Sequence, residues 1–415
     1  MHKTICAPLV ALVMTGCGGG GGGGSGGGNE PPPAQEPPVV TTPTAVRVTG
    51  TTPFSATCLA VPAGATAYAN AEVEPHLAIN PMNPNHLVAA WQQDRMSDGG
   101  ARGIATAVSV DGGVTWSRPQ PAPFTQCGGG SFARASDPWV AVSNSAILQI
   151  GIAFSGATLT AGARSTVLVS RSGDGGTTWS PAVQLVGDDG ARFFHDKETL
   201  TVDSTDARFV YAVWDRLDAS DTGVTLLARS MDGGLSWLPA VPIYDPGVAR
   251  QTIGNVAVTT PDGVVHIFFT ELGPSAANPA VTEGRLAVIR STDKGVTWSA
   301  PTRIAQLLAV GTRIPSQTSL TVRAGEILGA FAANPADGTL YAAWQDSRFT
   351  GGTHDAIVLA RSTDGGNTWS ASVRVNADAA VPAFTPTLAV LPSGLVGVMY
   401  YDFRQAGTPS YRPTD

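Results

Sequence analysis

The sequence predicts an all-β fold, a six-bladed β-propeller, and the main evidence is a short motif that recurs along the chain. The motif Ser-x-Asp-x-Gly-x-x-Trp occurs five times in 415 residues, at 109–116, 172–179, 230–237, 291–298 and 362–369. Its tryptophans are 58 to 71 residues apart. That spacing is typical of one four-stranded blade with its connections, so each copy indicates one blade.

Each copy of the motif is predicted to form a strand, a tight hairpin turn and a second strand. The aspartate accepts backbone N–H groups inside the turn, the glycine supplies a positive φ, and the tryptophan packs between blades. Because turn chemistry explains the same acid in every blade, we interpret these acids as folding residues rather than catalysts. They are Asp111, Asp174, Asp232, Asp293 and Asp364.

A second repeat raises the number of blades to six. It consists of an apolar strand, a turn and a strand that ends in an aromatic residue and charges, which leaves no room for long helices. Its copies are 77–95, 139–155, 199–216, 256–271, 331–348 and 387–404.

The sixth blade is expected to be incomplete, because the chain stops at Asp415 where a sixth hairpin should begin. One interpretation is that a strand around residues 46–48 pairs with the last blade and closes the ring. The other is that the sequence is truncated. We favour the second, since two outer strands are lacking and one N-terminal strand replaces only one of them.

The N-terminus predicts export. Lys3 precedes a short apolar run at 5–14 and then Thr15-Gly16-Cys17, and the run is too short to span a bilayer. This stretch resembles the bacterial lipobox, which implies a signal peptide at 1–16 and a lipid on Cys17. Residues 17–44, rich in Gly and then Pro, are predicted to be a tether and 45–415 the propeller. We therefore expect a lipid-anchored protein of the bacterial cell envelope that meets membrane only through its lipid.

Net charge limits the classes of binding partner, and the cysteine content indicates one disulfide candidate. A formal charge of −7 without a Lys/Arg cluster argues against nucleic acid, and we expect a monomer. Cys6 lies in the signal and Cys17 is the lipid site, which leaves Cys58 and Cys127. These two form a disulfide in an oxidising compartment, or else remain as buried thiols.

Chemistry is expected on the face opposite the repeated turns, where loops reach the first strand of each blade and leave the second. Acids and arginines alternate there, which suits a glycan or another polar or anionic ligand. The residues after the second strands are Asp94, Arg95, Asp215, Arg216, Glu271, Asp346, Arg348, Asp402 and Arg404. Those at the first strands are Glu74, His76, Asp137, His195, Asp196, Lys197 and Glu198.

Two interpretations of these charges remain open. Asp and Arg recur together in four blades, and a pair repeated by blade also suits interblade salt bridges. The run His195-Asp196-Lys197-Glu198 and the pair Tyr400-Tyr401 occur once each, which makes them better functional candidates. The alternative for the run is a buried ion network that ties the second blade to the third.

The five-fold motif is the Asp-box, or BNR repeat, and the chain from about residue 74 onward resembles sialidases and sialidase-like secreted proteins. The resemblance implies three arginines on a substrate carboxylate, for which Arg216, Arg348 and Arg404 are the candidates. It also implies a tyrosine nucleophile, Tyr401 or Tyr400, paired with Glu271 or Glu198, and Asp137 as the acid. If the chain is an enzyme, an exo-α-sialidase type of glycoside hydrolase is implied.

The sequence departs from sialidases at the first inner strand. Sialidases carry Arg-Ile-Pro there, whereas this chain has Glu74-Pro75-His76, and its Arg313-Ile314-Pro315 lies in an insertion at 307–328. Two hypotheses follow: a glycan-binding or sialidase-like hydrolase, and a non-catalytic binding or adhesion propeller of the envelope.

No cofactor is expected. Calcium is a minor alternative, because Asp203, Asp206, Asp218 and Asp221 lie close together in sequence, although their spacing does not form an EF-hand loop.

Overall fold

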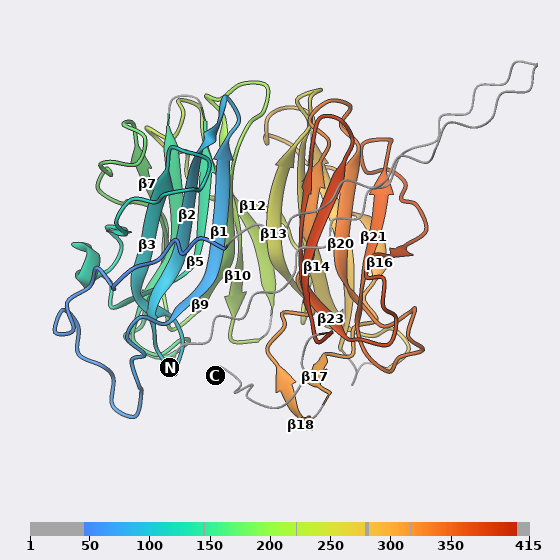
Figure 1. Cartoon of the computed structure of the whole chain (residues 1–415), viewed down its shortest axis with the longest axis horizontal. Coiled ribbons are helices and arrows are strands. Elements are labelled where there is room, and N and C mark those ends of the chain that lie inside the picture. Colours follow the sequence, from blue (N-terminus) through green and yellow to red (C-terminus); the bar gives the residue numbers. More distant parts are fainter. Residues whose placement is uncertain (1–44, 144–145, 221, 279–281, 316, 405–415) are drawn as a thin grey trace, which may run out of the picture.

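The computed structural model describes residues 45–404 except 144–145, 221, 279–281 and 316. The predicted signal peptide, Cys17 and the Gly/Pro tether lie outside the described residues. The described strands form six blades, which confirms the predicted fold class (Figure 1). No helix among the described residues is long and apolar enough to cross a membrane.

The first three blades are four-stranded antiparallel meanders. Blade one contains β1 (Glu72–Asn80), β2 (Asn83–Arg95), β3 (Ala101–Ser109) and β4 (Gln120–Pro121). Blade two contains β5 (Arg134–Val142), β6 (Ile147–Ser155), β7 (Arg164–Ser172) and β8 (Val183–Asp189), and a short 3-10 helix, η1 (Gln126–Gly128), precedes it. Blade three contains β9 (Phe193–Val202), β10 (Val210–Asp218), β11 (Gly223–Ser230) and β12 (Val241–Tyr244).

The remaining blades follow the same order. Blade four contains β13 (Gln251–Thr259), β14 (Val265–Pro274), β15 (Thr282–Ser291) and β16 (Thr302–Gln306). A hairpin of β17 (Thr312–Ile314) and β18 (Gln317–Val322) then projects at the bottom of Figure 1. Blade five contains β19 (Ala330–Ala333), β20 (Leu340–Asp346), β21 (Ala356–Ser362) and β22 (Val373–Arg374). Blade six contributes β23 (Ala383–Val390) and β24 (Val396–Asp402) to the described part of the chain.

The Asp-box turns are built as the sequence predicts. In blade one the Thr115 backbone N–H and hydroxyl donate to the Asp111 carboxylate at 2.9 and 2.6 Å, and the Ser109 hydroxyl donates to it at 2.8 Å. Hydroxyl and backbone donors hold the pKa of Asp111 down at about 2. The box tryptophans pack between blades, and Trp237, for example, contacts a core made by blades two and three.

The segment before β1 does not close the ring. Residues 45–50 form no strand, and Val48 packs on the blade-one cluster that contains Trp91. The pairing of residues 46–48 with the last blade is therefore not formed, because blade one offers this segment an apolar surface.

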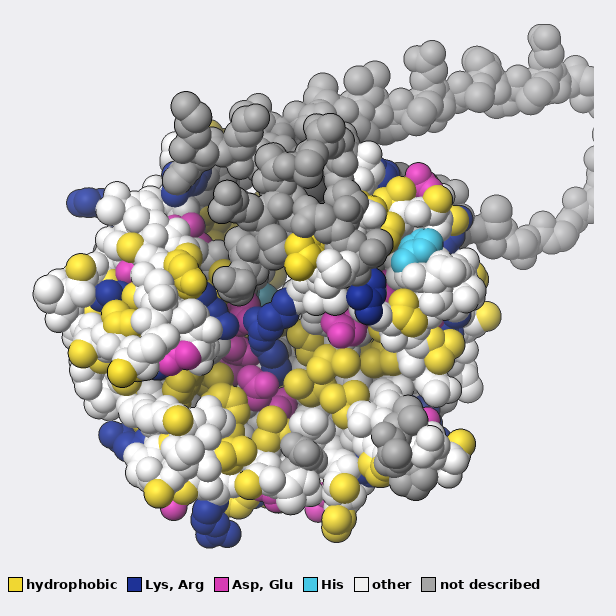
Figure 2. Space-filling view, turned by 90° about the horizontal axis from the view of Figure 1, so that it is seen from below, with side chains coloured by type: hydrophobic (Ala, Val, Ile, Leu, Met, Phe, Trp, Pro, Cys, Tyr) yellow, Lys and Arg dark blue, Asp and Glu magenta, His cyan; other side chains and the backbone are white. Residues whose placement is uncertain are grey.

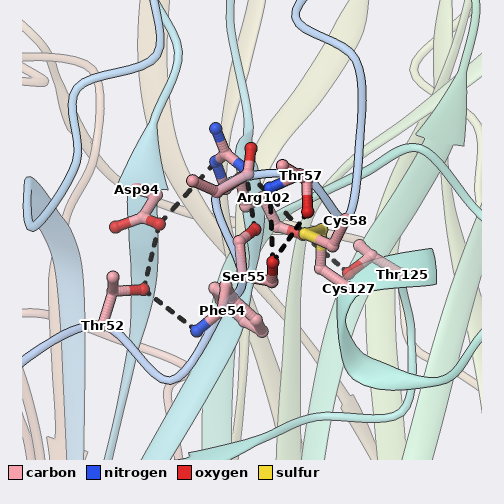
Figure 3. The surroundings of a disulfide bond; sticks show 10 residues. Thr52, Phe54, Ser55, Thr57, Cys58, Asp94, Arg102, Thr125 and Cys127 are labelled. Atoms are coloured by element: carbon pink, nitrogen blue, oxygen red, sulfur yellow. Dashed lines mark hydrogen bonds and ion pairs between the residues drawn. A yellow bond between two sulfur atoms is a disulfide. The ribbon is translucent and has the colours of Figure 1, made fainter.

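Figure 3 shows how the next part of that segment is fixed to blade one. Cys58 and Cys127 are joined in a disulfide, one of the two alternatives that the sequence left open. The Arg102 guanidinium donates to the Ser55 and Ala56 carbonyls at 3.0 and 2.8 Å, and the Thr52 hydroxyl donates to Asp94 at 2.9 Å. Asp94 is thus held by the N-terminal segment.

Loss of the disulfide should destabilise the domain. The bond links residues 69 positions apart, so the chain-entropy model assigns it roughly 4 kcal/mol. We expect the variant with Cys58→Ser and Cys127→Ser to lose about that free energy of unfolding in urea titrations without reductant. Wild type with reductant should match the variant, and equal unfolding midpoints of the two proteins without reductant would contradict the assignment.

Candidate functional site

A β-bulge interrupts the innermost strand of five blades near its first residues. At each bulge one residue has a positive φ: Glu74 (52°), Asp137 (54°), Lys197 (51°), Gly254 (68°) and Thr385 (50°). A positive φ is costly for residues other than glycine, and a bulge re-aims its side chain. The same backbone device therefore positions one residue of each of these blades at one end of the propeller axis.

Three of these residues form an ion cluster, called here the mouth cluster: Glu74, Asp137 and Lys197. The Lys197 ammonium lies 2.7 Å from Asp137 Oδ2 and 3.8 Å from Glu74 Oε1, so it joins blades one, two and three. Figure 2 views this face of the molecule and shows basic and acidic side chains gathered in a hollow near its middle.

Neighbouring polar groups orient the two carboxylates. The Gln92 side chain donates to Glu74 Oε2 at 2.6 Å and to the Ser136 hydroxyl at 2.8 Å, and that hydroxyl donates to Asp137. Arg323, which follows β18 and is 78% exposed, lies 3.7 Å from Glu74. The insertion at 307–328 thus reaches the mouth cluster.

The pKa values of Glu74 and Asp137 are shifted in opposite directions. Burial and the nearby Asp137 charge raise the pKa of Glu74. Burial also acts to raise the pKa of Asp137, but the Lys197 ammonium outweighs it, and the pKa of Asp137 is lowered. Such a pair can supply one protonated acid and one ionised carboxylate at the same pH.

More carboxyl groups lie beside and beneath the cluster. Burial, followed by the charge of Asp137, raises the pKa of Asp196 to about 7. Glu198 is 2% exposed, and neither of its carboxyl oxygens has a hydrogen-bond partner among the described residues. Asp215 is fully buried, with Asn255 Nδ2 donating to it at 3.2 Å. Burial raises the pKa of Glu198 and of Asp215, so both favour the neutral form.

The run 195–198 therefore divides between two environments. Lys197 faces the mouth, whereas His195 is buried inside the blade, where the Trp214 indole donates to its Nδ1 at 3.0 Å and Asp188 lies 3.2 Å from its Nε2. Burial lowers the pKa of His195, which favours the neutral ring. His195 and Lys197 each contact an aspartate of blade two, Asp188 and Asp137, so the ion network between blades two and three is present, and a functional role for the run stays a prediction.

The three arginines proposed for a substrate carboxylate have separate partners. Arg348 forks onto Asp346 of its own blade at 2.7 and 2.8 Å, and Arg404 pairs with Asp402 of its own blade. Arg216 lies 3.6 Å from Asp188 and stacks over Phe193. Arg95, also proposed as a ligand residue, donates to Gln92 and to the Gly100 carbonyl.

The proposed pairing of Tyr401 with Glu271 is not formed in the described residues. Tyr401 is 51% exposed on β24 and stacks with Phe384, whereas Glu271 lies on β14, two blades away. The Glu271 carboxylate instead accepts from the Tyr244 hydroxyl at 2.7 Å and from Arg250 at 3.2 Å. Burial and Glu271 raise the pKa of Tyr244, which keeps this phenol protonated at neutral pH.

Asp221, one of the four residues of the calcium alternative, lies outside the described residues. Among the residues that the structure describes, no group of three or more His, Cys, Asp or Glu side chains is arranged to hold a metal ion. Asp203 binds the Tyr211 hydroxyl at 2.9 Å and the Lys294 ammonium at 2.8 Å, a pairing internal to the fold.

Comparison with known proteins supports the fold. No family model matches the chain. It is similar to an α-L-arabinanase from Penicillium chrysogenum, at 16% identity and a TM-score of 0.51 over 80% of this chain and 94% of the arabinanase. It is also similar to an α-L-arabinofuranosidase from Fusarium graminearum, at 12% identity and a TM-score of 0.52 over 80% of this chain and 94% of the arabinofuranosidase. The similarity to the NanB sialidase from Streptococcus pneumoniae has 12% identity and a TM-score of 0.51 over 84% of this chain and 67% of the sialidase.

Replacing Glu198 by Gln should make the protein more stable than wild type at high pH. The raised pKa of Glu198 means that the folded state keeps a proton that the unfolded chain releases. The associated stability is complete below the unfolded pKa of about 4.3 and is lost as pH rises through the folded pKa. In urea titrations, Glu198→Gln should exceed wild type in free energy of unfolding at pH 8, and by less at pH 5.

Asp337→Asn, at an exposed turn, is the control and should follow the wild-type pH profile. If Glu198→Gln and wild type lose stability in parallel from pH 5 to pH 8, the carboxyl is not held neutral by burial.

Proposed function

We propose that this chain is a glycan-acting propeller that binds a terminal, uncharged sugar at the mouth cluster and cleaves its glycosidic bond. The observation that carries the proposal is the pair Glu74 and Asp137, two carboxyl groups on one ammonium whose pKa values are moved apart. Glycoside hydrolysis needs one protonated and one ionised carboxyl group beside the same bond.

Each carboxyl group has a defined part in the proposed reaction. Glu74 donates its proton to the glycosidic oxygen as the bond from that oxygen to the anomeric carbon breaks, while an Asp137 oxygen bonds to that carbon. Water then displaces Asp137, and the Glu74 carboxylate takes the water proton. We favour this retaining course because Glu74 and Asp137 share the Lys197 ammonium and hydrogen-bond to each other, which brings the two carboxyl groups closer together than the roughly 6.5–9.5 Å typical of inverting pairs.

An uncharged sugar suits the mouth better than a sialic acid. The ionised Asp137 would repel a substrate carboxylate, and Arg348 and Arg404 are each held by an aspartate of their own blade. Two structural neighbours also support a neutral sugar: the Penicillium chrysogenum arabinanase and the Fusarium graminearum arabinofuranosidase were each solved with arabinobiose.

A non-catalytic binding propeller is the second candidate. The observation in its favour is that Lys197 contacts both carboxylates and so offsets the charge that hydrolysis would use. A site arranged in this way can hold sugar hydroxyls without cleaving a bond.

The N-terminal sequence supports a location for this activity. We propose that a lipid on Cys17 holds the propeller at the bacterial cell envelope, on the strength of the lipobox-like run that precedes it.

The hydrolysis proposal can be tested with 4-nitrophenyl glycosides of neutral sugars, the α-L-arabinofuranoside among them, beside a fluorogenic sialoside. We expect release from a neutral glycoside and none from the sialoside. Glu74→Gln should lower kcat by roughly 10²–10⁴-fold, the usual scale of acid–base catalysis, and Asp137→Asn, which removes the nucleophile, should abolish turnover. Asp262→Asn, in a turn between β13 and β14 on the opposite rim, is the matched control and should retain the wild-type rate.

Release of sialic acid that depends on Arg348 would contradict the proposal. If no glycoside is cleaved but a neutral sugar binds, and Glu74→Gln abolishes that binding, the second candidate is the correct one.

The same assay predicts a bell-shaped pH profile. Hydrolysis needs Glu74 protonated, so kcat should fall as pH rises past the raised pKa of Glu74. It also needs Asp137 ionised, so kcat should fall again at low pH, below the lowered pKa of Asp137. The residual activity of Glu74→Gln should lack the alkaline limb, and an unchanged alkaline limb would assign the proton to another group.

A further inference from the structure

A second hollow lies on blade three, outside the mouth cluster. It is an open depression of about 450 Å³, a volume within the usual range for ligand pockets. Its lining residues, called here the blade-three cavity, are Arg216, Val224, Pro242, Ile243, Tyr244 and Asp245. We infer that this cavity is a second sugar-binding subsite, so that the ligand is an oligosaccharide chain rather than a single sugar. The inference that the ligand is longer than one sugar rests on the proposed function of the mouth, whereas the inference that the cavity binds a sugar does not.

Strand register places the cavity on a line outward from the mouth. Arg216 of β10 pairs with His195 of β9, two residues from Lys197, and also with Val224 of β11. Thr225 of β11 pairs in turn with Tyr244 of β12. At about 4.8 Å between neighbouring strands, β12 lies roughly 14 Å from β9. The mouth and the cavity therefore occupy the same end of one blade, at a separation greater than one sugar ring.

The walls of the cavity are held in place before any ligand binds. The Tyr244 hydroxyl is anchored on Glu271 at 2.7 Å, and its ring stacks on Phe269 with 5.0 Å between centroids. The Arg216 guanidinium lies 4.4 Å over the Phe193 ring. Side chains fixed in this way lose little freedom on binding, which favours affinity.

The polar groups of the cavity fit a neutral sugar. Arg216 lines the cavity and its side chain is 29% exposed, so guanidinium N–H groups are available there to donate to a sugar hydroxyl. Asp188, 3.6 Å from Arg216, offsets the positive charge, and exposed Asp245 adds an acceptor. Tyr244, Ile243 and Val224 provide an apolar wall for the face of a sugar ring. An anionic ligand would meet both aspartates and is disfavoured.

The test measures how tightly the wild-type protein and its variants bind linear neutral oligosaccharides. Each oligosaccharide is immobilised on a glycan array in a series of lengths from one to six sugars. Wild type should bind the longer members of one series at least tenfold more tightly than its single sugar. The double variant Arg216→Ala, Asp245→Ala should lose that gain, and Tyr244→Ala should lose it as well. The control double variant Arg208→Ala, Asp337→Ala removes the same residue types from turns on the opposite rim and should keep the gain.

The outcomes separate the cavity from the mouth. A length gain that survives in both cavity variants, or no length gain in any neutral series, overturns the inference. If wild type shows the length gain and the cavity variants lose it, but wild type cleaves no neutral glycoside, the subsite stands and the hydrolysis proposed for the mouth fails. Circular dichroism spectra that match wild type are required of each variant, and Arg216→Lys, which keeps the charge but not the fork, should restore part of the gain.

Discussion

The ion pair between Lys197 and Asp137 is the interaction on which the candidate site depends. It joins blade two to blade three at the mouth, and it keeps Asp137 ionised at a place where burial alone would favour its neutral form. Glu74, Asp196, Glu198 and Asp215 surround the same ammonium, and burial raises the pKa of each. Among these five neighbouring carboxyl groups, the ammonium thus favours the ionised form of Asp137 most strongly.

Backbone geometry makes this ion pair possible. Glu74, Asp137 and Lys197 each have a positive φ at a bulge, an arrangement that strains three non-glycine residues. Strain of this kind is retained where the surrounding structure fixes it, and here the contacts of Lys197 with Asp137 and Glu74 do so, together with the hydrogen bonds from Gln92 and Ser136 to the two carboxylates. The repeated scaffold and the unrepeated side chains therefore have separate roles: the scaffold repeats the bulge, and the sequence of each bulge determines the chemistry of the mouth.

The sequence predicted the fold well because its signals are local. Each box encodes its own turn, so the blades and the packing of Trp237 could be read from a few residues at a time. Asp137 and Lys197 were also identified as candidates, since their positions at the start of inner strands follow from the repeat. The tyrosine on Glu271 could not be predicted, because Tyr244 lies on a short outer strand with no motif and its contact crosses from blade three to blade four. A signal for the bulges was present, however: proline follows Glu74, Asp137 and Thr385, and its missing N–H is tolerated at a bulge.

The most direct test of the central role of Lys197 is a carbon-13 NMR titration of the Glu74 and Asp137 carboxyl groups in wild type and in Lys197→Met. In wild type we predict a Glu74 pKa above its ordinary 4.5 and an Asp137 pKa below its ordinary 3.8. In Lys197→Met the Asp137 pKa should rise above 3.8, because burial then acts without the opposing ammonium. Ordinary pKa values for both groups in wild type, or an Asp137 pKa that does not move in Lys197→Met, would contradict the assignment of the mouth cluster as an acid–base pair set by Lys197.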